Sequence, residues 1–164
     1  MAMTIVPFYN VTAAVGRGVG GYSTDIMLVQ YMLFKICINP RPHFDRNIGL
    51  FGPVLNGPNG GRCLFPVSGV YSPDLDEWIK AFQRAANERG YGQLVVDGKI
   101  NRAPVGWGQH SGGSNHQWYT IQAMNLIMYR TIVPPYIDFP SLSDMPAALG
   151  TELSRVALPE WTLP

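Results

Sequence analysis

The sequence predicts a mainly α-helical domain of three helices, with long loops between the helices and an extended arm at each end. Three segments have apolar residues at helical spacing and carry start or stop signals at their ends. The other segments are rich in turn residues, with 18 glycines and 14 prolines among 164 residues. A chain of this length fits one domain and buries a core of its own.

Charge is scarce in this chain, and the two signs nearly cancel. The sequence has 12 Lys and Arg residues against 11 Asp and Glu residues, which gives a formal net charge of +1. Charged residues make 14% of the chain, against about 25% in ordinary soluble domains. So small a net charge offers no basic field to a nucleic acid. We therefore expect no nucleic-acid partner, and a surface suited to contact other molecules.

The sequence predicts neither a signal peptide nor a membrane span. Its N-terminal segment lacks a basic region followed by a long apolar run. The longest apolar stretch, Asp25–Asn39, contains Gln30 and Lys35 and is shorter than the roughly 20 residues that a bilayer requires. We expect synthesis in the cytoplasm without a signal peptide. Three final locations are left as alternatives: a virion, an injection machine and the cell envelope.

Residues 1–22 are interpreted as an N-terminal arm, with a strand-like run over Thr4–Phe8. The glycine-rich segment Gly16–Tyr22 lacks the lysine and the acidic residue of a nucleotide-binding loop, so we predict no nucleotide site there. The first helix is expected over Thr24–Ile38, capped by Ser23 or Thr24. It is apolar on nearly all sides, which predicts a central helix or one that meets a partner.

The second helix has the clearest boundary signals. Ser72 is the expected N-cap, Pro73 takes the first position, and Gly90 stops the helix. Apolar residues at helical spacing predict its buried face, and three polar residues are expected to face water. The buried face comprises Leu75, Trp78, Ile79 and Phe82, and the residues expected in water are Lys80, Arg84 and Asn87. An Asp-Gly turn at Asp97 is expected to follow.

The third helix is expected over about Asn115–Tyr129, which completes a helical domain over residues 23–131. Its expected inward residues are Trp118, Ile121, Met124 or Asn125, and Met128. Residues 132–164 form a proline-rich C-terminal arm that wraps the domain or lies on a neighbour, with a short helical piece around Ala147–Val156. The long loop over residues 39–71 is expected to be functional or docked on another part.

Cys37 and Cys63 are the two cysteines of the chain. Two cysteines do not make a disulfide framework. We interpret them as small buried hydrophobic residues, with a single bridge between them as the alternative.

Several residues match the pattern of a known bacterial module. In the first helix the matching residues are Ile26, Val29, Gln30 and Leu33. In the segment SGVYSPDLDEWIKAFQ they are Gly69, Tyr71, Ile79, Phe82 and Gln83, and a second repeat begins at Leu94, Asp97, Gly98 and Ile100, with Thr120 as its threonine. Ser68, Ser72, Leu75 and Trp78 depart from the pattern. Through these residues the chain resembles the peptidoglycan-binding-like domain over residues 22–131, apart from two inserted loops.

The resemblance implies a three-helix bundle and a role for each matched residue. The Asp-Gly turn reverses the chain before a helix, the aromatic residue after it fills the core, and the helix glutamine holds a loop backbone. The resemblance also implies a non-catalytic module that binds bacterial cell-wall glycopeptide.

No set of side chains predicts catalysis, a metal or another cofactor. The histidines, His43, His110 and His116, lack the short spacing of zinc ligands. There is no Gly-x-Ser-x-Gly elbow, and we predict no catalytic pairing of Cys63 with a histidine. The acidic residues Asp74, Asp76, Glu77 and Glu88 are interpreted as helix-start charge and a solvated face, and Asp97 as a turn residue. We expect a protein that is not an enzyme.

The polar, aromatic loop over residues 101–118 is the predicted ligand site. Sugars stack on aromatic faces and need amides around them. The candidate ligand-binding residues are Trp107, Gln109, His110, Asn115, Gln117 and Trp118. In the alternative interpretation, Trp118 belongs to the core and Trp107 anchors its loop or a partner.

Two functions are consistent with the sequence. The first is a non-catalytic binding module for peptidoglycan. The second is a structural or adaptor subunit of a phage-tail-like or contractile injection or secretion assembly, in which the apolar arms contact other protein subunits. In the second case the chain is expected to be part of an oligomer or a larger assembly.

Overall fold

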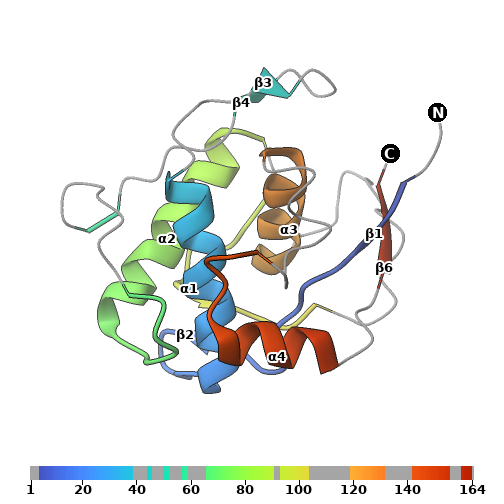
Figure 1. Cartoon of the computed structure of the whole chain (residues 1–164). Helices are drawn as coiled ribbons and strands as arrows, with labels where there is room; N and C mark the ends of the chain where they lie inside the picture. The colour runs from blue at the N-terminus through green and yellow to red at the C-terminus, as the bar shows by residue number, and fades with distance from the viewer. Residues whose placement is uncertain are drawn as a thin grey trace.

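The computed structural model describes residues 4–38, 44–45, 50–51, 57–58, 66–90, 93–103, 119–131, 142–155 and 160–163. Over these residues the fold is mainly helical (Figure 1). Its helices are α1 (Ser23–Ile38), α2 (Pro73–Glu88), α3 (Thr120–Thr131) and α4 (Ala147–Arg155). Its strands are β1 (Thr4–Pro7), β2 (Val15–Gly16), β3 (Phe44–Asp45), β4 (Leu50–Phe51), β5 (Lys99–Ile100) and β6 (Glu160–Leu163).

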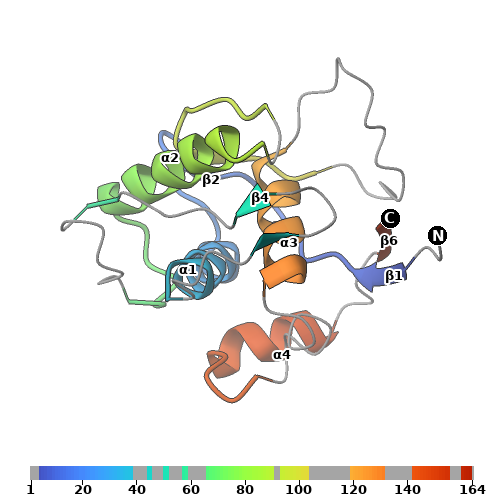
Figure 2. The ribbon, with the colours of Figure 1, turned by 90° about the horizontal axis from the view of Figure 1, so that it is seen from above.

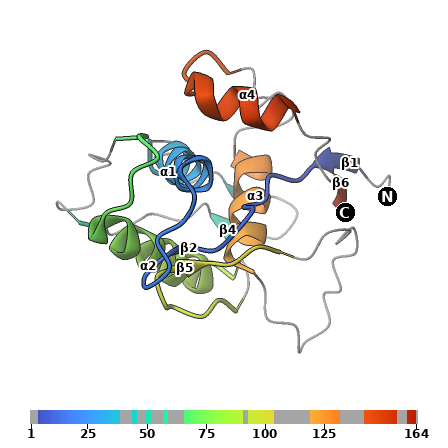
Figure 3. The same cartoon turned by 90° about the horizontal axis from the view of Figure 1, so that it is seen from below.

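The strands form short antiparallel pairs rather than one large sheet. β2 pairs with β5, with Val15 opposite Ile100, and β3 pairs with β4. β1 pairs with β6 in the register Thr4 to Leu163, so the two ends of the chain meet in one ribbon. This ribbon lies to the side of α3 in Figures 1, 2 and 3.

Helix α1 is the central element, because it contacts α2, α3 and α4. In the view of Figure 2, α1 and α3 lie between α2 and α4. Side chains from opposite faces of α1, such as Val29, Tyr31 and Leu33, are each at most 1% exposed. Burying an aliphatic side chain of this size contributes about 1.5–3 kcal/mol. The prediction of a helix buried on nearly all sides is confirmed.

Helix α2 begins at Pro73 and ends before Gly90, as its signals predict. Gly90 has a φ of +76°, a conformation that suits a glycine after a helix. Ser72 occupies the N-cap position, but its side chain makes no capping hydrogen bond. The predicted apolar face is buried, and Gly57 of the long loop lies against the ring of Trp78.

Two polar residues of α2 differ from the prediction of a water-facing surface. Asn87 is half-buried, and its side-chain amide donates to the carbonyl oxygen of Leu94 at 2.9 Å while it accepts from the Leu94 amide at 2.7 Å. Lys80 is also half-buried, with its ammonium group 3.1 Å from Glu77. Asn87 therefore fixes the segment after the helix, whereas Arg84 is exposed as expected.

Helix α3 begins at Thr120, five residues later than predicted. The side chain of Gln122 reaches back and accepts a hydrogen bond from the Tyr119 amide at 2.9 Å. This contact resembles half of a capping box and defines the start of the helix. The predicted inward residues Ile121, Met124, Asn125 and Met128 are all fully buried, whereas Trp118 lies outside the described residues.

The N-terminal segment after β1 packs into the same core as the helices. Phe8, Tyr9 and Val11 are buried. The side chain of Asn125 in α3 accepts from the Tyr9 amide at 2.9 Å and donates to the Tyr9 carbonyl oxygen at 2.8 Å. Asp25 in α1 accepts from the backbone amides of residues 12 and 13 at 2.8 and 3.0 Å. Side chains of two helices therefore hold this segment against the domain.

Cys37, near the end of α1, is disulfide-bonded. The interpretation of Cys37 as a small buried hydrophobic residue outside any disulfide is therefore wrong, and the alternative, in which this residue takes part in a bridge, agrees with the structure. The other cysteine of the sequence is Cys63, which lies outside the described residues.

Helix α4 docks on α1 through Leu149, Leu153 and a polar contact at Asp144. The Asp144 carboxylate accepts hydrogen bonds from the Tyr31 hydroxyl, at 2.6 Å, and from the Lys35 ammonium group. Burial raises the pKa of Asp144, but the hydrogen bonds from Lys35 and Tyr31 outweigh it and hold that pKa below its ordinary value. Burial, and then the contact with Asp144, raises the pKa of Tyr31 far above its ordinary range.

These pKa shifts predict how the docking of α4 depends on pH. Because the pKa of Asp144 is lowered, its carboxylate stabilises the fold above about pH 4, and this contribution is lost as the pH falls further. Because the pKa of Tyr31 is raised, its neutral hydroxyl stabilises the fold below about pH 10. We expect the Leu149 and Leu153 methyl NMR shifts to stay constant from about pH 4 to 10 and to change on the acid side only as the pH falls below about 4. Because Asp144 is 47% exposed, the contribution is below about 1 kcal/mol. Asp144→Asn should remove the change on the acid side, and an unchanged acid titration in this variant contradicts the assignment.

None of the helices in the described part of the chain has the length and apolar character that a membrane crossing requires.

Candidate functional site

A tight turn over residues 68–70 is held on helix α1 by the side chain of Gln30. The Gln30 oxygen accepts hydrogen bonds from the amides of Ser68 and Gly69, at 2.9 and 2.8 Å. The Gln30 amide donates to the carbonyl oxygen of Val70 at 3.1 Å. Gly69 has a φ of +73°, and a Cβ atom there would lie 2.5 Å from the Ser23 hydroxyl. The turn therefore requires both the glutamine and the glycine.

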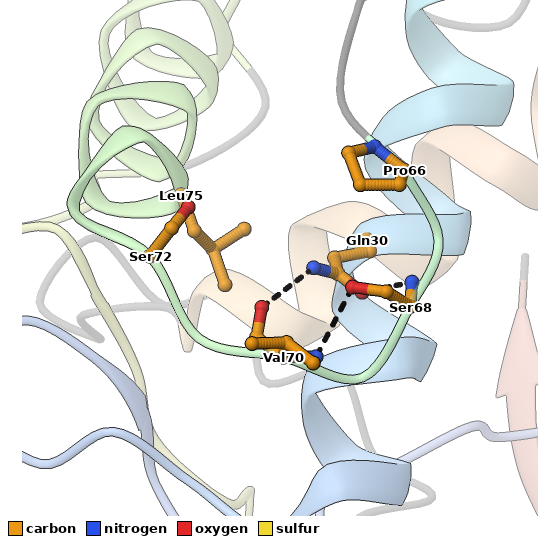
Figure 4. Close-up of a pocket in the computed structure, with 6 residues that line it drawn as sticks. All are labelled: Gln30, Pro66, Ser68, Val70, Ser72 and Leu75. Atoms are coloured by element: carbon orange, nitrogen blue, oxygen red, sulfur yellow. Dashed lines mark hydrogen bonds between the residues drawn. The ribbon is translucent and has the colours of Figure 1, made fainter.

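This turn forms one side of an open groove with a volume of about 270 Å³. Figure 4 shows Gln30 of α1 between the loop that precedes α2 and the first turn of α2. The lining residues are Gln30, Pro66, Ser68, Val70, Ser72 and Leu75. Their surface is mostly apolar, with the hydroxyl groups of two serines. A groove of this kind suits a small ligand segment that carries methyl groups.

Val70 of the groove lining and Tyr22, which is not part of the lining, both have exposed apolar side chains. Val70 is 68% exposed and Tyr22 is 64% exposed. Ser23, which follows Tyr22, contacts Gly69, which precedes Val70. Tyr22 and Val70 therefore lie on neighbouring segments. Exposed apolar residues beside a groove are typical of contact surfaces.

Tyr71 and Asp76 form a hydrogen-bonded pair beside these residues, with 2.6 Å between the Tyr71 hydroxyl and the Asp76 carboxylate. Asp76 lies in the first turn of α2, as expected for a charge at the start of a helix, but it is only 8% exposed and therefore does not lie on a solvated face. Its second carboxylate oxygen has no hydrogen-bond partner among the described residues. The hydrogen bond to Asp76, followed by burial, raises the pKa of Tyr71, although the charge of Arg17 opposes the shift. The pair connects the turn to the first turn of α2.

A second turn with the same hydrogen-bond pattern follows α2. The oxygen of Gln83 accepts from the amides of Asp97 and Gly98, both at 3.1 Å, and its amide donates to the Lys99 carbonyl oxygen at 3.0 Å. The Asp97 carboxylate accepts from the Lys99 amide, as the Ser68 hydroxyl accepts from the Val70 amide. The predicted role of Asp97 as a turn residue is confirmed.

The two turns agree in every contact of the glutamine with the turn backbone. The expectation that a helix glutamine holds a loop backbone is therefore confirmed at Gln30 and at Gln83. The Gln83 amide also donates to the Thr120 hydroxyl at 3.1 Å, which connects the second turn to the start of α3. Gly98, with a φ of +75°, is the counterpart of Gly69.

The sequence-predicted ligand residues lie outside the described residues. These residues are Trp107, Gln109, His110, Asn115, Gln117 and Trp118, and their proposed role stays a prediction. The histidines considered as metal ligands also lie outside. Among the described residues, no three His, Cys, Asp or Glu side chains gather closely enough to hold a metal ion.

The groove beside Gln30 was not predicted from the sequence, although Gln30 and Gly69 both belong to the motifs that the resemblance identified. No family model, curated protein or solved structure was found to match the chain. The groove and the two turns are therefore the basis for a functional proposal.

Proposed function

We propose that this protein is a non-catalytic module that binds bacterial cell-wall glycopeptide through the groove beside Gln30. The observation that supports the proposal is an open, mostly apolar groove whose wall is fixed by three hydrogen bonds between the turn backbone and a single buried glutamine, which accepts two of them and donates one. A wall held in this way is preorganised, so a ligand loses little free energy in ordering it. The sequence resemblance to peptidoglycan-binding-like domains is the second line of support.

Parts of the terminal segments lend further support, because residues that follow β1 and residues of α4 pack on their own domain. Tyr9 and Val15 of the N-terminal segment and Leu149 of the C-terminal segment belong to the same core as the helices. The groove is lined by other residues and stays open. The disulfide at Cys37 suits an oxidising compartment, and therefore suits the cell envelope, a virion or an injection machine as the place of action.

The test is retention of the protein by purified peptidoglycan. Val70→Asp is expected to weaken retention about tenfold, because it removes an exposed aliphatic contact and adds a charge that the ligand would desolvate. Val95→Asp is the matched control, since Val95 is 53% exposed and does not line the groove. It should bind as the unmodified protein does.

Two results would contradict the proposal. One is retention of the unmodified protein that is no better than that of an unrelated domain of similar size. The other is equal retention of the two valine variants when both unfold at the same temperature.

A structural subunit is the second candidate function, and the ribbon of β1 and β6 favours it. A two-stranded ribbon is marginally stable by itself, and an added strand from a neighbouring subunit would stabilise it. In this case we propose that the arms contact other subunits of a larger assembly. Light scattering separates the candidates, since a monomer at all concentrations counts against a self-assembling subunit.

A further inference from the structure

We infer that the groove beside Gln30 takes the peptide part of the glycopeptide, namely a short peptide with small aliphatic side chains and a free amino group. The inference rests on the proposed function and specifies which half of the ligand contacts this site. It is supported by the hydrogen-bonding capacity, the size and the charge of the groove.

Two of the three polar side chains that line the groove, Gln30 and Ser68, make hydrogen bonds within the protein. The Gln30 oxygen accepts two backbone hydrogen bonds, and its amide donates a third. The Ser68 hydroxyl accepts from the Val70 amide at 3.2 Å. A sugar unit of the glycan carries hydroxyl and acetamido groups, and each one that is buried without a partner weakens binding. A peptide with methyl side chains has fewer polar groups to satisfy.

The size and shape of the groove point to the same ligand. Its volume of about 270 Å³ lies just below the roughly 300–1,000 Å³ of pockets that enclose a drug-sized molecule. None of the six lining residues is aromatic, so the lining offers no flat face for a sugar ring to stack on. Pro66, Val70 and Leu75 instead present aliphatic surface to small side chains.

The negative charge of Asp74, next to lining residues in the sequence, favours a ligand that carries an ammonium group, although the charge of Arg17 near Tyr71 opposes this preference. Asp74, in the first turn of α2 between the lining residues Ser72 and Leu75, is exposed. None of the lining residues is basic. An exposed charge pair contributes little to affinity, so Asp74 affects mainly the choice and orientation of the ligand.

The test is an NMR titration of the full-length chain with two probes. One probe is the pentapeptide L-Ala-γ-D-Glu-L-Lys-D-Ala-D-Ala, and the other is a tetramer of N-acetylglucosamine. We expect the peptide to shift the backbone amides of Ser68, Gly69, Val70 and Leu75, and the sugar to leave them unchanged. Acetylation of the lysine side chain in the peptide should weaken binding about two- to fivefold, and Asp74→Asn should weaken it by a similar factor.

Matched variants and the intact polymer distinguish the outcomes. Val70→Ser should weaken peptide binding about tenfold, because it removes an aliphatic contact without adding a charge, whereas Val95→Ser should leave it unchanged. Shifts at these amides with the sugar alone would overturn the inference. Retention by intact peptidoglycan without any effect of the peptide would also overturn it, but would leave the proposed function standing. If the protein binds neither the peptide, nor the sugar, nor intact peptidoglycan, both the inference and the proposed function are overturned.

Discussion

Replacing Gln83 by alanine is expected to lower the free energy of unfolding by about 3–5 kcal/mol. Gln83 is 1% exposed. Its side chain contacts the backbone amides of Asp97 and Gly98, the carbonyl oxygen of Lys99 and the hydroxyl of Thr120. Alanine would leave these groups without their partner and would leave a cavity in the core. Urea denaturation followed by tryptophan fluorescence measures the change.

Two other glutamines provide controls for this prediction. Gln93 is exposed, so Gln93→Ala should change the stability by less than about 0.5 kcal/mol. Gln30→Ala removes the same pattern of contacts from the first turn, but Ser68 and Val70 are exposed and water would partly replace the lost bonds. We expect a loss of about 1–2 kcal/mol there. Equal stability of the Gln83 and Gln93 variants would show that the amide does not hold the second turn.

The helices were predictable where their boundary signals are local in the sequence. Ser72 and Pro73 mark the start of α2 and Gly90 its end, and the structure agrees within one residue. The short helix expected around Ala147–Val156 is α4. The start of α3 was misplaced because Tyr119 is not a residue type that favours an N-cap, and because the contact with Gln122 that defines the boundary depends on side-chain geometry.

The candidate site was harder to predict because its contacts join distant segments. Gln30 and Ser68 are separated by 38 residues, and the intervening loop gives no indication of where it returns to α1. The sequence did indicate that each helix glutamine holds a turn. It did not indicate that the first turn borders a groove, since a groove depends on the space left between α1, α2 and the loop that joins them.

Gly16→Ala is expected to destabilise the protein by about 3–5 kcal/mol. Gly16 has a φ of +117°, and a Cβ atom there would overlap the carbonyl oxygen of Gly98 and press on the Ile79 side chain. The overlap is with backbone, which relaxes less readily than a flexible side chain. The Arg17 amide donates to the same Gly98 oxygen at 3.0 Å, so a shift of either strand would disturb the pairing of β2 with β5.

Gly18→Ala is the matched control for this substitution. Gly18 also has a positive φ, of +79°, but a Cβ atom there would meet nothing within 4 Å. Its replacement should cost about 1–2 kcal/mol, which is the backbone cost alone. A difference of at least about 2 kcal/mol between the two variants in urea denaturation is therefore expected. Equal losses of stability in the two variants would mean that β2 does not pack closely on the second turn at Gly98. Gly16 would then be required only for its positive φ.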